Sequence, residues 1–210
     1  MMSLLFPRKC LLCGRLLSRK ELDLCESCRS DTDSWQKGKR KFQFLDSVTA
    51  VWYYEEYVRR CIVRYKFYGA RHMASGLGRC MAMKLLQDGP EDYDLITWVP
   101  VSTLRKLKRG YDQSHLLARC LGKELGISPV RCLKKIRNNK KQSTLQDAAR
   151  RRANVLGVYR VTRPELVEGK KILIIDDVLT TGATAGECAR VLLTAGAKEV
   201  HCAVLAAARK

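Results

Sequence analysis

The sequence lacks any apolar run approaching the roughly 18 to 20 residues that a membrane-spanning helix needs. Its first residues hold only a short apolar stretch and no small-residue cleavage site, so we expect neither a secretory signal nor membrane insertion. Histidine is scarce, and the three present, His72, His115 and His201, are too far apart to form a metal-ligand motif. We therefore expect a cytoplasmic protein without a catalytic histidine.

Acidic residues are also few. The 210 residues include 21 Asp and Glu against 40 Lys and Arg, which gives a formal net charge of +19. This excess excludes an ordinary balanced surface and indicates a polyanionic partner: nucleic acid, a phosphorylated metabolite, or both. Charge alone leaves the choice open, because a phosphate site needs only a few basic groups.

No internal repeat or low-complexity segment is present. Apolar and β-branched segments predict strands at residues 47–54, 94–100, 130–133, 170–178 and 199–207. Helical spacing predicts helices at 58–67, 72–86, 112–125 and 182–194, with a basic turn before the third. Strands that alternate with helices predict an α/β fold, a parallel sheet flanked by helices with right-handed crossovers.

Ten cysteines are present, but not in the dense arrangement of a small disulfide-rich domain. Cys10, Cys13, Cys25 and Cys28 form two Cys-x-x-Cys pairs, a spacing that lets four thiolates reach one tetrahedral metal. Residues 1–36 are therefore predicted to be a structural zinc module, in which about 10 to 16 kcal/mol of metal binding replaces an apolar core. A nucleic-acid role for this module is an open alternative. The other cysteines are expected to be small buried apolar residues: Cys61, Cys80, Cys120, Cys132, Cys188 and Cys202.

A second domain, residues 45–210, is expected after a basic linker at 37–41. Its most informative segment reads KILIIDDVLTTGAT, a buried strand that ends in two carboxylates, followed by a loop of small residues that opens a helix. The N-terminus of a helix suits a phosphate, and Gly182 allows a close backbone approach. Asp176 and Asp177 could accept hydrogen bonds from sugar hydroxyls. Because ligands bind beyond the carboxyl ends of parallel strands, the segment predicts a ribose-phosphate site.

Two other interpretations of the acidic pair are weaker. One helix cap does not call for two adjacent acids after a buried strand. The acidic strand of an ATPase would require a Gly-x-x-x-x-Gly-Lys-Ser/Thr loop, which the sequence lacks. Basic residues that follow the strand at 94–100 suit a pyrophosphate, although a solvated basic loop is the alternative. They are Arg105, Lys106, Lys108 and Arg109.

The segment at 171–184 closely resembles the motif that binds phosphoribosyl diphosphate (PRPP) in type I phosphoribosyltransferases. The resemblance implies that Asp176 and Asp177 contact the ribose hydroxyls, with Mg²⁺ accompanying PRPP. It also implies a 5′-phosphate loop, made of Thr180, Thr181, Gly182, Ala183 and Thr184.

Motifs at 65–69, 99–102, 109–113, 142–145 and 150–154, together with the acidic pair, resemble the ComF (ComFC/GntX-like) family in matching order. That family couples a zinc-binding N-terminus to a phosphoribosyltransferase domain. The resemblance implies a pyrophosphate loop with Val101, Ser102, Arg105 and Arg109. It also implies a mobile hood that carries Gln142, Arg150 and Arg151. The chain departs from many relatives at Tyr111-Asp112, where their pattern has Phe-Asn.

ComF relatives are associated with natural competence, where imported single-stranded DNA is handled in the cytosol with a helicase-like ATPase. The resemblance thus implies a PRPP-binding protein of DNA uptake, with PRPP and single-stranded DNA as partners. Two alternatives stay open: a catalytically silent PRPP sensor that binds nucleic acid, and a metabolic phosphoribosyltransferase unrelated to competence. Some aromatic residues could stack on bases, although most are expected in the core. They are Trp35, Trp52, Tyr53, Tyr54 and Tyr57.

Overall fold

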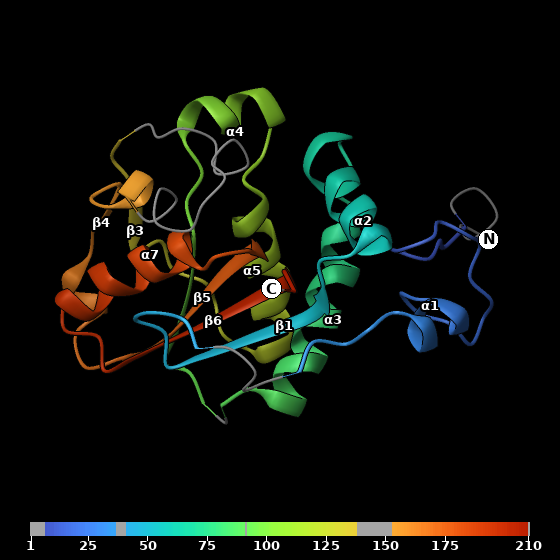
Figure 1. Ribbon diagram of the computed structural model, residues 1–210, viewed down its shortest axis with the longest axis horizontal. Coiled ribbons are helices and arrows are strands. Elements are labelled where there is room, and N and C mark those ends of the chain that lie inside the picture. The colour runs from blue at the N-terminus through green and yellow to red at the C-terminus, as the bar shows by residue number, and fades with distance from the viewer. Residues whose placement is uncertain (1–6, 37–40, 91, 138–152, 210) are drawn as a thin grey trace.

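The computed structural model describes residues 7–36, 41–90, 92–137 and 153–209. At its centre is a parallel sheet, as the sequence predicts, and its spatial order is β1-β6-β5-β2 (Figure 1). The strands are β1 (Ser47–Tyr53), β6 (Glu199–Ala207), β5 (Lys171–Leu179) and β2 (Leu95–Trp98). Their β-branched and aliphatic sequences suit strands that are buried on both faces.

Helices cover the two faces of the sheet. One layer holds α2 (Glu56–Phe67), α3 (Met73–Asp88) and α5 (Gln113–Leu125). The other holds α7 (Ala183–Thr194) and the antiparallel pair β3 (Leu133–Lys135) and β4 (Tyr159–Val161), followed by the 3-10 helix η2 (Pro164–Leu166). Alternate residues of β5 face the two layers, so Leu173 packs in the first core and Ile174 in the second. Among the described residues, no helix is long and apolar enough to cross a bilayer.

Two local predictions are wrong. The basic segment expected as a turn is helix α4 (Thr103–Arg109), in which the Ser102 hydroxyl accepts a 3.4 Å bond from the Arg105 amide and Gly110 ends the helix at φ +76°. The strand expected at 130–133 does not join the parallel sheet. Val130 donates one 2.8 Å hydrogen bond to the Ile96 carbonyl, and the chain then enters β3, which pairs with the unpredicted β4.

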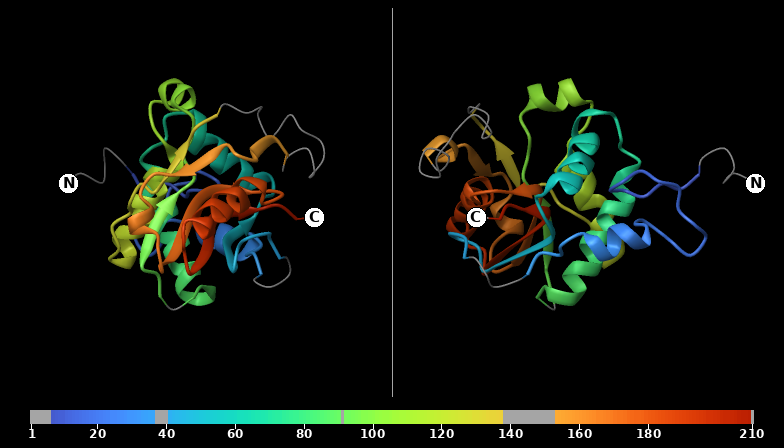
Figure 2. Two further views of the ribbon diagram at one scale, coloured as in Figure 1. Left: turned by 90° about the vertical axis from the view of Figure 1, so that its left-hand side faces the viewer. Right: turned by 45° about the vertical axis from the view of Figure 1, so that its right-hand side comes forward.

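The N-terminal module, with the short helix α1 (Glu26–Asp31), lies on the outer side of α2 and α3, away from the sheet (Figures 1 and 2). The Arg64 guanidinium of α2 donates to the carbonyls of Leu11 (2.6 Å) and Leu12 (2.8 Å). On α3, Arg79 makes a two-pronged ion pair with Asp23 at 2.9 and 2.6 Å. These bonds fix the module to the same helices that cover one face of the sheet.

Candidate functional site

The two carboxylates lie next to each other near the end of β5, which runs to Leu179, close to the strand predicted at 170–178. Asp176 Oδ1 accepts hydrogen bonds from the Ser114 hydroxyl and from the Asp177 amide, each 2.9 Å long. Asp177 Oδ1 lies 2.8 Å from Lys66 Nζ at the end of α2, and both side chains are largely buried. Three elements, α2, α5 and β5, thus each place a polar side chain at the acidic pair.

The environment of Asp176 changes its acidity. Burial raises the pKa of this carboxyl to about 7, and the neighbouring charge of Asp177 adds to the rise. The Asp177 amide, the Lys66 ammonium and the Ser114 hydroxyl partly oppose it. The acidic pair therefore holds a proton that it can release near neutral pH, as expected when two carboxylates share a site with one cation.

The loop after β5 provides a small, close-fitting turn. Gly182 has φ +78°, a left-handed conformation that favours glycine, and α7 begins at the next residue. The Ala183 amide donates a 3.4 Å hydrogen bond to Thr181 Oγ1, and the Gly186 amide donates to the Gly182 carbonyl at 2.7 Å. This loop follows the acidic pair directly, which is the arrangement that the sequence predicts for a phosphate beside a sugar.

The predicted pyrophosphate residues follow β2, which pairs with β5 in parallel so that Trp98 lies opposite Ile175. Val101 and Ser102 therefore lie at the same sheet edge as the acidic pair. The Arg109 guanidinium lies 4.6 Å from the centre of the Phe67 ring. Burial lowers its pKa, and the charge of Asp177 partly offsets this effect.

Arg105 lies near two other basic groups, Arg109 and Lys135. Burial lowers the pKa of Lys135 on β3 to about 8, and the charge of Arg105 adds to the shift. The Lys135 ammonium lies 5.7 Å from the centre of the Tyr159 ring. The structure thus brings Arg109 towards the acidic pair and Arg105 towards Lys135. The predicted hood residues Gln142, Arg150 and Arg151 lie outside the described residues.

Sequence reasoning missed two polar residues at the acidic pair, Lys66 and Ser114. Lys66 belongs to the motif at 65–69, and Ser114 follows the motif at 109–113, so the signal lay in the motifs and not in either residue type. It also missed Arg71, which donates a 2.7 Å hydrogen bond to the Gly110 carbonyl and lies 4.9 Å from the centre of the Tyr111 ring. Arg71 thus ties the connection between α2 and α3 to the connection between α4 and α5.

The four cysteines predicted to bind zinc form one cluster. The sulfur atoms of Cys10, Cys13, Cys25 and Cys28 all lie within 4.8 Å of one another. Two amide hydrogen bonds reach this cluster, from Cys25 to Cys10 Sγ (3.4 Å) and from Cys28 to Cys25 Sγ (3.5 Å). Since Zn–S bonds of about 2.3 Å place tetrahedral sulfurs about 3.8 Å apart, the donor set fits a structural zinc ion.

The remaining cysteines and histidines are structural. Cys120 is half-buried, the other cysteines outside the cluster are buried, and burial raises the thiol pKa of each. Such thiols are poor nucleophiles. His201 is buried and bonds Ser47 Oγ at 2.9 Å, while the His115 ring stacks on Trp98 with centroids 4.3 Å apart. His72 is exposed just before α3.

The aromatic residues considered for base stacking divide as expected. Trp35 and Trp52 are buried in the core, and Tyr53 and Tyr54 are partly buried. Tyr57 is 63% exposed on α2.

The parallel sheet, the loop after β5 and the cysteine cluster define a phosphoribosyltransferase-type domain that carries an N-terminal zinc ribbon. The family comparison agrees, because residues 113–210 match the phosphoribosyl transferase domain and residues 1–39 match the double zinc ribbon domain. The DNA utilization protein YhgH of Escherichia coli O157:H7 is 30% identical over 197 residues, which cover 91% of this chain and 81% of the relative. The competence protein ComFC of Bacillus subtilis (strain 168) is 29% identical over 187 residues, covering 89% of this chain and 72% of the relative. The chain belongs to the ComF family, together with these proteins.

Among solved structures, glutamine PRPP amidotransferase from B. subtilis, complexed with ADP and GMP, is 23% identical with a TM-score of 0.46. The match covers 68% of this chain and 30% of that chain. The chain thus spans less than a third of the length of this amidotransferase.

Proposed function

We propose that the chain binds PRPP at the sheet edge formed by the ends of β2 and β5. The observation that carries this proposal is the acidic pair, buried beside Lys66 and followed at once by the small loop at 180–184. In this arrangement Asp176 and Asp177 accept hydrogen bonds from the ribose hydroxyls. The 5′-phosphate lies on the loop, where backbone amides and the hydroxyls of Thr180, Thr181 and Thr184 can donate.

The diphosphate of PRPP takes the other side of the site. Val101 and Ser102 follow β2 at the same sheet edge. Arg109 lies close enough to Asp177 for the carboxylate charge to offset part of the lowering of the Arg109 pKa. A guanidinium binds a phosphate through paired hydrogen bonds. Because Arg109 is half-buried, few water molecules compete for these bonds. Gln142, Arg150 and Arg151 would close over the bound substrate from the hood.

Magnesium fits the chemistry of the donor set. Carboxylate oxygens are the protein ligands that Mg²⁺ prefers, and a bound cation would oppose the two effects, burial and the Asp177 charge, that raise the pKa of Asp176. The ion would neutralise the diphosphate and help it to leave. Asp176 and Asp177 would orient the ribose and, as carboxylates, stabilise positive charge that develops on the sugar ring. We propose pentosyl transfer to an acceptor as the reaction, with PRPP sensing without turnover as the second candidate.

Thermal unfolding with different ligands tests the binding site. PRPP with Mg²⁺ should raise the unfolding midpoint more than ribose 5-phosphate or pyrophosphate alone, because only PRPP contacts the loop, the acidic pair and Arg109 together. Equal effects of PRPP and pyrophosphate would refute a site for the whole molecule. Release of pyrophosphate that depends on an added acceptor would distinguish the transferase from the sensor.

The cellular role that we propose is the handling of single-stranded DNA in the cytoplasm during DNA uptake, with a helicase-like ATPase as partner. The net charge of +19 and the names of the relatives, a competence protein and a DNA utilization protein, support this role. Binding of a fluorescent oligonucleotide should weaken as salt rises, since phosphate contacts release counterions. It should persist in the Asp176→Asn, Asp177→Asn variant if DNA and PRPP occupy different sites. Salt-independent binding, or no binding, would refute the DNA role.

A further inference from the structure

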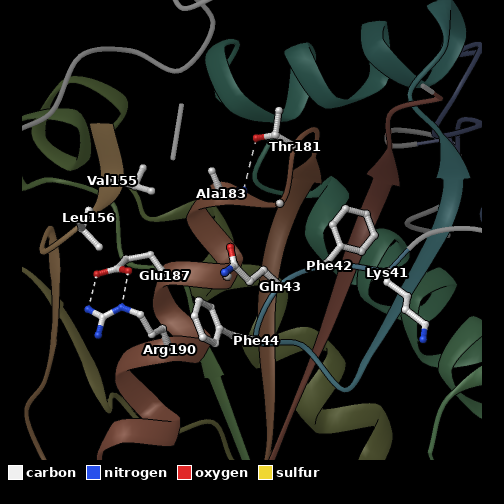
Figure 3. A pocket seen from close by; sticks show the side chains of 12 residues that line it. Lys41, Phe42, Gln43, Phe44, Val155, Leu156, Thr181, Ala183, Glu187 and Arg190 are labelled. Atoms are coloured by element: carbon white, nitrogen blue, oxygen red, sulfur yellow. Dashed lines mark hydrogen bonds and ion pairs between the residues drawn. The ribbon is translucent and has the colours of Figure 1, made fainter. Parts of the chain in front are cut away.

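A cavity of about 480 Å³ lies beside the loop that precedes α7 (Figure 3). One wall is the segment after the zinc module, with Phe42, Gln43 and Phe44, and the opposite wall holds Val155 and Leu156. The first turns of α7 form its floor. This volume is within the range of cavities that hold small organic ligands.

Two glycines of the floor lie directly against the first wall. An added Cβ would lie 2.5 Å from Phe42 Cδ1 at Gly182 and 2.9 Å from the Gln43 carbonyl oxygen at Gly186. Phe42 is therefore packed on the start of α7, and Phe44 is the exposed aromatic ring of this wall.

Phe44 is unusual in both backbone and exposure. Its φ of +64° makes it the one non-glycine residue with positive φ in the described part of the chain, and 41% of its surface is exposed. A bulky residue in this conformation costs free energy, and residues of this kind cluster at functional sites. Across the cavity, Leu156 is 64% exposed. Phe44 and Leu156 thus expose apolar side chains to solvent on opposite walls of the cavity.

One buried carboxylate, Glu187, holds the Arg190 side chain and the Gly157 amide in place. Glu187 accepts hydrogen bonds from the Gly157 amide and from Nε and Nη2 of Arg190, each 2.8 Å long. In Figure 3 the Arg190 guanidinium points towards Glu187 and away from the Phe44 ring. Glu187 offsets the charge of Arg190, so the exposed Lys41 leaves the cavity with a net positive charge.

We propose that this cavity binds one nucleobase of a single-stranded nucleic acid, with the base stacked on Phe44. The inference rests on the DNA role proposed above and assigns it a site. Stacking on an exposed aromatic ring is how proteins hold bases without reading their sequence. The Gln43 amide can pair with a base edge, and Lys41 can contact a flanking phosphate, which matches the charge of the chain.

Two oligonucleotides of equal length test the assignment, one of thymidines and one of abasic sites, measured by fluorescence anisotropy at the same salt. Phe44→Gly suits the positive φ and removes the ring, so the variant should unfold at the same temperature or higher. We expect it to lose about five- to a hundredfold in affinity for the thymidine chain and little for the abasic chain. Phe44→Tyr should keep the affinity. Leu86→Ala, which removes another exposed apolar side chain, on α3, should bind as the wild type does.

Different failures have different meanings. If Phe44→Gly binds the thymidine chain as tightly as the wild type, or loses both chains equally, the cavity is not a base site. If thymidine monophosphate displaces the thymidine oligonucleotide at a concentration as low as that at which the oligonucleotide itself binds, the cavity is a site for a free nucleotide and the assignment to a nucleic acid is wrong. If the wild type binds neither chain, the DNA role itself fails and this assignment fails with it.

Discussion

Lys66 Nζ lies 2.8 Å from Asp177 Oδ1, and this ion pair joins the end of α2 to the carboxyl-terminal part of β5. The side chains are only 19% and 13% exposed, so water screens the pair weakly. The Lys66 ammonium also opposes the rise in the pKa of the neighbouring Asp176, which burial raises to about 7. The pairing explains how two adjacent carboxylates can be held at one sheet edge before any ligand arrives.

Removal of the Lys66 charge should destabilise the protein. Lys66→Met leaves a buried carboxylate without its partner, and we expect the free energy of unfolding to fall by about 1 to 3 kcal/mol in urea titrations at pH 7. Arg60→Met is the control on the same helix. It removes an exposed pair with Glu56, whose side chains are 67% and 70% exposed, and should cost less than about 1 kcal/mol. Equal losses in the two variants would show that the buried ion pair contributes no more to the free energy of unfolding than the exposed one.

The raised pKa of Asp176 makes a signed prediction for stability against pH. Its ordinary value is 3.8, so between about pH 4 and pH 7 the native state holds a proton that the unfolded chain has released. This contribution to the free energy of unfolding is complete below pH 4 and is lost as the pH rises through 7. Asp176→Asn cannot lose a proton, so it should be more stable than the wild type at pH 8 by about 1 to 3 kcal/mol.

Chemical denaturation of the Asp176→Asn variant and the wild type at pH 5 and pH 8 measures this difference. The Asn amide oxygen can still accept from the Ser114 hydroxyl and the Asp177 amide, so the comparison isolates the charge. A gap that is equal at both pH values would contradict the raised pKa.

Gly182 should tolerate no side chain. Gly182→Ala would place a Cβ 2.5 Å from Phe42 Cδ1 and force alanine to φ +78°, and we expect a loss of about 2 to 4 kcal/mol in stability. Gly126→Ala separates the two effects, because Gly126 has φ +70° with nothing within 4 Å of the added Cβ. It should cost about 1 to 2 kcal/mol from backbone strain alone. Similar losses in urea titrations of both variants would show that the packing on Phe42 is unimportant.

Zinc removal should weaken the whole chain, not only its N-terminus. The module is tied to α2 by Arg64 and to α3 by the ion pair of Asp23 with Arg79, and metal binding is part of its folding energy. A chelator, or Cys25→Ser, should lower both the zinc content and the midpoint of thermal unfolding. Cys120→Ser, which alters a half-buried cysteine outside the cluster, should keep one zinc ion. An unchanged midpoint after zinc loss would mean that the module is independent.

Contiguous features could be predicted from the sequence, and distant ones could not. The strand, the acidic pair and Gly182 follow one another along the chain, so their chemistry is legible without a structure. Ser114 and Lys66 reach the pair from helices far away in the sequence, and only the packing of α2 and α5 on the sheet brings them there.

The missed elements have a similar physical reason. Helix α4 is seven residues long and carries only two apolar residues, Leu104 and Leu107, both of them exposed (73% and 75%). Two leucines three residues apart are too short a pattern to separate a basic helix from a basic turn. Strand β4 is three residues long and exists by pairing with β3. The cavity wall at Phe44 carries no signal in sequence, because neither its positive φ nor its exposure follows from its residue type.

The most direct test of the central claim is calorimetric titration of PRPP into the wild type and into the Asp176→Asn, Asp177→Asn variant, with and without Mg²⁺. Thermal unfolding of each protein confirms that it is folded. The account predicts binding to the wild type that Mg²⁺ strengthens, and a loss of at least about tenfold in the variant, since hydrogen bonds to charged groups contribute about 1.5 to 3 kcal/mol each. No binding to the wild type, or equal binding to the two proteins, would contradict a PRPP site built on these carboxylates.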